Sequence, residues 1–183
     1  MLNKIVKAGS ITNLTDARFF AAFDVNYIGF CFDPQSPNYI SPQNALAIKG
    51  WITGPKIVAE FANQDIDNIN NIIQFFEPDI IEVDAEYVEQ IIPTAQKFNL
   101  PIFARTPKLI TINNNVLFYI IPFVEKETIG NLIDKYIFDL SDSSTTNINI
   151  STINAIQLKG TPELEVGIKS FDKIAEILES ITN

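Results

Sequence analysis

Short apolar segments alternate with amphipathic segments along the whole chain. The continuous apolar run at 116–121 is typical of a strand buried on both faces of a parallel sheet, whereas Ile66, Ile69 and Ile73 recur at the spacing of one helix face. This pattern predicts strands at residues 4–8, 27–32, 56–61, 79–83, 101–105, 116–121, 136–140 and 154–159. It predicts helices at residues 15–23, 41–51, 65–76, 85–98, 126–135 and 170–181.

Eight strands alternating with helices predict a (β/α)8 TIM barrel in one domain of residues 1–183. Barrels of this kind usually contain about 200 residues or more, so the chain is short. Residues 107–115 and 141–151 are too polar and too few to form full crossover helices. We therefore expect the helices after strands five and seven to be reduced or missing. An open doubly wound sheet is the alternative, because short parallel crossovers do not by themselves require closure.

Polar residues mark the start of several of these helices. Asn13 or Thr15 is the expected N-cap of the first helix. Ser41 is followed by Pro42, which gives a capping hydroxyl and then proline at the first helical position. Asp65 stands in the same place before the third helix.

The composition indicates a globular and acidic protein. Hydrophobic residues make up 46% of the chain and charged residues 19%, and the formal net charge is −9 with a pI near 4.4. Surfaces that bind nucleic acids rely on clustered Lys and Arg, so we expect no nucleic-acid partner. The same charge disfavours a free anionic substrate unless the few cations converge locally.

The chain has one Cys and no His, which excludes an internal disulfide and removes the commonest general base and metal ligand at neutral pH. Cys31 lies inside an apolar strand, where a buried thiol behaves as a small hydrophobic side chain. The sequence has no leader pattern at its N-terminus and no apolar run of membrane-spanning length. We therefore expect a soluble cytoplasmic protein with no membrane segment.

Five motifs in the first half of the chain resemble those of one enzyme family. They are KAGSITNLTDA at 7–17, YIGF at 27–30, SPNYISP at 36–42, VAEFANQ at 58–64 and DIIEVD at 79–84. A weaker likeness follows near the end, in VGIKS at 166–170. Together these motifs resemble the phosphoribosylanthranilate isomerase family. The resemblance implies a (β/α)8 enzyme of tryptophan biosynthesis that performs an Amadori rearrangement of a phosphoribosylated anthranilate.

The resemblance also implies where the family's functional residues would lie, and those positions have changed. The family's general base is a Cys, and Gly9 stands in its place. Asn38 replaces a substrate-binding Arg, and residues 82–85 replace a Gln-Leu-His-Gly motif. The Gly-Gly phosphate loop after strand seven has no counterpart at 139–142, and the second phosphate loop keeps one glycine, Gly160.

The family's general acid is an Asp at the end of strand six. If strand six is 116–121, this acid is absent; if it is 136–140, Asp139 is the acid and a later strand is missing. The first assignment supplies eight strands, and we favour it. Proton transfer needs a titratable group within hydrogen-bond reach of the substrate, and Gly9 has no side chain. The resemblance therefore favours a divergent isomerase-like barrel in which the isomerase activity is lost.

Charged residues remain near the ends of the expected strands, where a barrel of this kind binds its ligands. One interpretation is a mouth that binds a small polar or phosphorylated metabolite through Arg, Lys and turn N–H groups. The alternative is an ion-pair network that fills the emptied site. The candidate ligand-binding residues are Lys7, Ser10, Asn38, Glu82, Asp84, Arg105, Lys159 and Gly160. Glu60, Glu82 and Asp84 lack the spacing of a metal-binding loop, so we expect no metal and no cofactor.

Three functions remain open from the sequence. The chain could still act on a phosphorylated sugar, it could bind a metabolite or partner without catalysis, or it could be a structural protein with a closed mouth. A homodimer is a further expectation. Phe19-Phe20 and Trp51 are candidates for its face, although Trp51 and the Phe75-Phe76 pair are first interpreted as core or helix-packing residues.

Overall fold

The computed structural model describes residues 2–123, 134–141, 150, 153–160 and 170–182. Within these ranges the elements follow one another in the order β1 (Ile5–Gly9), α1 (Leu14–Ala22), β2 (Tyr27–Cys31), α2 (Pro42–Lys49), β3 (Lys56–Glu60), α3 (Ile66–Phe76), β4 (Ile80–Asp84), the 3-10 helix η1 (Ala85–Tyr87), α4 (Val88–Phe98), β5 (Ile102–Arg105), β6 (Val116–Pro122), β7 (Tyr136–Asp139), β8 (Ala155–Lys159) and α5 (Asp172–Ser180).

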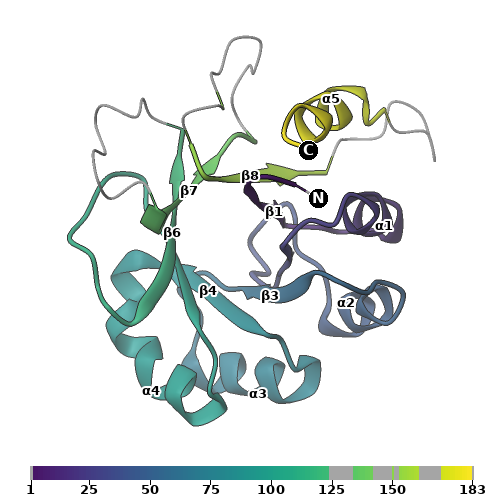
Figure 1. Ribbon diagram of the computed structural model, residues 1–183. Helices are drawn as coiled ribbons and strands as arrows, with labels where there is room; N and C mark the ends of the chain where they lie inside the picture. The colour runs from purple at the N-terminus through teal and green to yellow at the C-terminus, as the bar shows by residue number, and fades with distance from the viewer. Residues whose placement is uncertain (1, 124–133, 142–149, 151–152, 161–169, 183) are drawn as a thin grey trace.

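The strands form a closed parallel barrel in sequence order (Figure 1). Closure is made between β1 and β8, where Ile5 lies opposite Ala155 and Gly9 lies opposite Lys159. The prediction of a (β/α)8 barrel is therefore confirmed, and the alternative of an open doubly wound sheet is wrong.

The helices lie outside the barrel, close to the positions that the sequence predicts. The expected helix at 85–98 begins as the 3-10 helix η1 and continues as α4. Residues 106–115, which connect β5 to β6, are all described and contain no helix. The expected helix at 126–135 and the connection after β7 fall largely outside the described residues, so these two expectations stay predictions.

Side-chain caps determine where the helices begin. The side chain of Asn13 accepts a hydrogen bond from the backbone N–H of Asp16 at 2.9 Å, so Asn13 and not Thr15 caps α1. Asp65 caps α3 in the same way, accepting from the N–H of Asp67 at 2.9 Å. Each of these caps follows the preceding strand closely, so the helices start beside the carboxyl ends of the strands.

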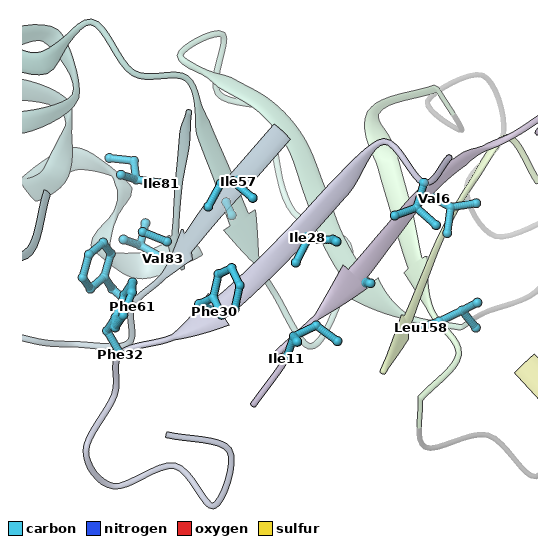
Figure 2. Packing of buried hydrophobic residues seen from close by; sticks show 14 of the residues in the cluster. Val6, Ile11, Ile28, Phe30, Phe32, Ile57, Phe61, Ile81, Val83 and Leu158 are labelled. Carbon is cyan, nitrogen blue, oxygen red and sulfur yellow. The ribbon is translucent and has the colours of Figure 1, made fainter. Parts of the chain in front are cut away.

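The larger apolar core lies between the strands and the surrounding helices. Val6, Ile28 and Ile57 on the strands (Figure 2) belong to the same cluster as Phe20 of α1 and Ile73 of α3. Full burial of such side chains contributes about 1.5–3 kcal/mol each to folding. This layer attaches the helices to the barrel.

The aromatic residues considered for the core or for a dimer face are divided between the interior and the surface. Trp51 is 73% exposed and Phe75 is 47% exposed, so the expectation that they are core residues is wrong. Phe76 is fully buried, as expected. Phe20 is also fully buried and Phe19 packs against the core, so of the candidates for a dimer face Trp51 remains on the surface.

A smaller cluster fills the inside of the barrel. Its members come from six successive strands, β3 to β8, and are Val58, Ile80, Phe103, Ile120, Ile137 and Ala155. Side chains on a strand alternate between its two faces, so the residue two positions later also points inward. In five of these strands that residue is polar: Glu60, Glu82, Arg105, Asp139 and Gln157. The interior therefore changes from apolar to charged toward the carboxyl ends of the strands.

A glycine on β2 makes room for one of these charged side chains. A Cβ atom on Gly29 would lie 1.9 Å from Oε1 of Glu60 and 2.7 Å from its carboxyl carbon. No side chain fits at that distance unless Glu60 moves. Gly29 is therefore required by the inward carboxylate of the neighbouring strand.

We predict that Gly29→Ala destabilises the protein by about 1–3 kcal/mol, because the added methyl group overpacks the barrel interior. Gly50→Ala is the matched control, since a Cβ there has no neighbour closer than 3.5 Å and the backbone is already helical with φ −65°. Urea unfolding of both variants measures the difference. Equal stability of the two variants would contradict this account of Gly29.

Candidate functional site

The centre of the charged layer is the ammonium group of Lys7, on β1. Its side chain is 0% exposed. Lys7 Nζ lies 2.5 Å from Glu60 Oε1 on β3 and 2.9 Å from Glu82 Oε2 on β4, and it donates to Gln157 Oε1 on β8 at 2.7 Å. One buried cation thus joins four strands of the barrel.

Glu60 receives further hydrogen bonds from the turn after β1. The backbone N–H of Ser10 lies 3.1 Å from both carboxylate oxygens of Glu60, and Ser10 Oγ donates to Oε2 at 2.8 Å. Ser10 has a φ of 51°, in the left-handed region that is uncommon for residues with a side chain. The donors that we expected to bind phosphate at Ser10 are therefore bound to an internal carboxylate.

Arg105, at the end of β5, extends the network toward solvent. Its NH2 group lies 3.1 Å from Asp84 Oδ1 and donates to the carbonyl oxygen of Phe61 at 2.8 Å. Its NH1 group lies 3.6 Å from Glu82 Oε1. Lys7, Glu60, Glu82, Arg105 and Asp84 therefore form one chain of ion pairs, as the alternative interpretation of the sequence expects.

A second branch runs from Lys7 to Asp139. Gln157 donates from Nε2 to Asp139 Oδ2 at 2.7 Å, and Asp139 Oδ1 accepts from the N–H of Ser141 at 2.9 Å and from its hydroxyl group. Asp139 is the last residue of β7, and β6 ends at Pro122. The assignment with Asp139 at the end of strand six is therefore wrong, and β6 itself contains no acid between Val116 and Pro122.

Burial and charge shift the pKa values inside the network in different directions. Burial opposes the charge of Lys7, but attraction by Glu60 and Glu82 outweighs it and raises the pKa of Lys7. Burial likewise opposes ionisation of Glu60, but Lys7, Arg105 and Ser10 together lower its pKa. The pKa of Glu82 is raised by burial and by the charge of Glu60, and its Oε2 receives no hydrogen bond of good geometry from the described residues. Folding therefore favours the ionised form of Glu60 and disfavours that of Glu82.

The charged network also occupies the space beside Gly9. A Cβ atom on Gly9 would lie 3.0 Å from Cδ and Oε1 of Gln157 and 3.2 Å from Nζ of Lys7. Both contacts are tighter than ordinary van der Waals distances. A Cys at this position would therefore fit only if Gln157 or Lys7 moved.

A second internal carboxylate lies against Gly160, the glycine kept from the expected phosphate loop. A Cβ atom on Gly160 would lie 2.1 Å from Asp16 Oδ2. Asp16 is 3% exposed, and the same oxygen accepts a hydrogen bond from Asn13 Nδ2 at 2.8 Å. A phosphate at Gly160 would have to approach this buried carboxylate.

A pocket of about 600 Å³ opens on the other side of the barrel mouth. Its lining comes from the ends of β4 to β7 and from the segments after β4 and β5, and comprises Asp84, Ala85, Glu86, Arg105, Thr106, Pro107, Lys108, Ile110, Ile120, Ile121, Pro122 and Asp139. Its walls are mainly apolar, and Asp84, Arg105 and Asp139 are the residues of the ion-pair network that reach it.

The structure brings together five of the eight candidate ligand-binding residues: Lys7, Ser10, Glu82, Asp84 and Arg105. Asn38 lies in the loop between β2 and α2 and Lys159 ends β8, and among the described residues no hydrogen bond or ion pair joins either side chain to the network. Cys31 is 4% exposed and does not line the pocket, and burial raises the pKa of its thiol.

Gln157 and Ser141 were not among the candidates. The sequence pattern indicates Gln157, because this polar residue lies between Ala155 and Lys159 on the inner face of an otherwise apolar strand. Its partner Asp139 could not be identified from spacing, since the contact depends on how β7 and β8 pair.

In the part of the chain that the structure describes, no group of His, Cys, Asp or Glu side chains is arranged to hold a metal ion. Lys7 lies between Glu60 and Glu82, where a cation shared by these two carboxylates would sit. Of the described helices, none is both long enough and apolar enough to cross a membrane.

The sequence is similar to curated phosphoribosylanthranilate isomerases, although no protein-family model matches the chain. The isomerase of Sulfurihydrogenibium sp. (strain YO3AOP1) is 24% identical over 213 residues, which cover 98% of this chain and 99% of that protein. The isomerase of Rhizobium meliloti (strain 1021) is 29% identical over 83 residues, 44% of this chain and 39% of that protein.

The fold is also shared with solved structures of the same name. Monomers of the dimeric phosphoribosylanthranilate isomerase from Thermotoga maritima superpose with a TM-score of 0.72 and 20% identity, covering 97% of this chain and 98% of that one. These matches confirm the resemblance to the phosphoribosylanthranilate isomerase family, and they show that its relatives include a dimer.

We predict that Glu60→Gln destabilises the protein by about 3 kcal/mol or more at pH 7, because it leaves Lys7 without its ionised partner. We expect Glu82→Gln to destabilise the protein less, by about 1 kcal/mol, because the Glu82 carboxyl group is protonated more readily than that of Glu60. Chemical unfolding measures both values, and Glu176→Gln, an exposed change on α5, is the control.

The two variants also differ in their dependence on pH. Folding lowers the pKa of Glu60, so the stability from its ionised form is present above the unfolded pKa and lost as pH falls through the folded pKa. Folding raises the pKa of Glu82, so its contribution is present at low pH and lost as pH rises. Glu60→Gln should therefore lose less stability on acidification than the unchanged protein. If Glu82→Gln destabilised the protein more than Glu60→Gln at pH 7, the roles assigned to the two carboxyl groups would be reversed.

Proposed function

We propose that this chain is a divergent member of the phosphoribosylanthranilate isomerase family that has lost the isomerase reaction and binds a small polar metabolite at the mouth of its barrel. The proposal rests on the side chains that surround Gly9. The position that the family resemblance assigns to the general base has no side chain, and Gln157 and Lys7 occupy the space beside it.

Lys7, Glu60 and Cys31 are not suited to replace the missing base. A general base must accept a proton within hydrogen-bond reach of the substrate, with a pKa near the working pH. The pKa of Lys7 is raised, so its amine stays protonated, and the pKa of Glu60 is lowered while its oxygens are bound by Lys7 and Ser10. Cys31 is a buried thiol outside the pocket.

The expected phosphate positions are also unfavourable for an anion. Glu60 is bound to the donors of Ser10, and Asp16 lies against Gly160. A phosphorylated substrate would bring its charge next to these two buried carboxylates. This supports a ligand other than a phosphoribosylated one.

An active isomerase is the second candidate. It is favoured by the full-length similarity to the Sulfurihydrogenibium isomerase and by Asp139 and Arg105, which line one pocket. In that case Asp139 would be the acid, although it ends β7, and the base would have to come from another group. A homodimer would be compatible with either candidate, and the exposed Trp51 is the residue we would place in its interface.

We predict that the gene for this chain does not restore growth of a tryptophan auxotroph that lacks its isomerase, and that the purified protein does not turn over phosphoribosylanthranilate. Gly9→Cys should not restore activity either, because the new side chain meets Gln157 and Lys7. A known isomerase expressed from the same vector is the positive control. Growth of the auxotroph, or turnover by the purified chain, would overturn the proposal.

A further inference from the structure

We propose that the pocket at the ends of β4 to β7 binds a small organic amine, with its ammonium group attracted by the Asp84 and Asp139 carboxylates that line the pocket and its apolar body against Ile110, Ile120 and Ile121. This inference rests on the proposed function, and it names the ligand class for the same barrel mouth.

The shape and lining of the pocket suit a small molecule with an apolar part. A volume of about 600 Å³ is within the range of small-molecule sites. Pro107 and Pro122 extend the apolar wall that the three isoleucines form. The ligand body would displace water from this wall, which favours binding by about 25 cal/mol for each Å² of apolar surface covered.

The two carboxylates approach the pocket from separate strands. Asp84 ends β4 and Asp139 ends β7, with β5 and β6 between them in the barrel. Asp84 uses Oδ1 for Arg105, and no described residue donates to its Oδ2. Asp139 Oδ2 accepts one hydrogen bond, from Gln157, and a carboxylate oxygen can accept a second. Both groups therefore retain acceptor capacity for an ammonium group.

The charge balance also favours a cation. Among the described residues, three acidic side chains line the pocket, from Asp84, Glu86 and Asp139, against two basic ones, from Arg105 and Lys108. Arg105 is already bound to Asp84, to the Phe61 carbonyl and to Glu82. An incoming carboxylate or phosphate would compete with these partners, whereas an amine meets an excess of negative charge.

The test compares four compounds of similar size that differ in charge: benzylamine, benzyl alcohol, benzoate and phenyl phosphate. Isothermal titration calorimetry at low salt measures their binding to the full chain. We expect benzylamine to bind at least about tenfold more tightly than benzyl alcohol, a difference of about 1.4 kcal/mol, and benzoate to bind more weakly than the alcohol.

Substitutions then locate the site. Asp84→Asn and Asp139→Asn should each weaken benzylamine binding by about three- to tenfold and leave benzyl alcohol unchanged. Glu176→Gln on α5 removes one negative charge outside the pocket and should leave both affinities unchanged. Asp84 makes fewer internal contacts than Asp139, so its variant tests the site even if Asp139→Asn unfolds.

Three results would overturn the inference: no binding of benzylamine, equal binding of benzylamine and benzyl alcohol, or an unchanged benzylamine affinity in Asp84→Asn. Tightest binding of phenyl phosphate would also overturn it and would favour a phosphosugar ligand. Turnover of phosphoribosylanthranilate would instead overturn the proposed function, and it is measured separately, so the two failures can be distinguished.

Discussion

The buried ammonium group of Lys7 is the constraint on which the barrel interior depends. A charge with no exposure to water is tolerated when it is paired and hydrogen-bonded, and Lys7 meets this requirement through Glu60, Glu82 and Gln157. These partners come from β3, β4 and β8, so the cation is satisfied only when distant parts of the chain are in their correct register. The apolar cluster below it places these strands, and Lys7 then favours one arrangement of their polar residues.

The same network reaches the positions where the family resemblance implies catalysis and phosphate binding. Gly29 provides the space for the Glu60 carboxylate, and this carboxylate then takes the donors of Ser10. Gly160 in turn allows the approach of Asp16. At both places the protein supplies its own anion: at Gly160, where the family resemblance implies a phosphate loop, and at Ser10, whose turn N–H was a candidate phosphate donor. Internal contacts of the fold therefore occupy both positions.

The sequence alone was sufficient for the barrel because its strands are continuous apolar runs at regular separation, and because the helix caps at Asn13 and Asp65 are local signals. It was insufficient for the site because the important contacts join strands that are far apart in the chain. The contact of Gln157 with Lys7 depends on the closure between β1 and β8, and that with Asp139 depends on the pairing of β7 with β8. The exposure of Trp51 is not predictable from the sequence for a related reason, since an aromatic residue after a helix gives no sign of which side it faces.

The barrel mouth is consequently divided into two halves with different properties. Around β1, β3 and β8 it is filled by Lys7, Glu60 and Gln157, whereas the pocket is lined from β4 to β7 and the segments after β4 and β5. A ligand in this pocket would lie against Asp84, Arg105 and Asp139 and would not contact Gly9, which is not part of the lining. Reintroducing a base at Gly9 would therefore place it beside the filled half of the mouth and away from the space where a ligand can bind. A substitution at Gly9 alone would therefore not place a base in this pocket.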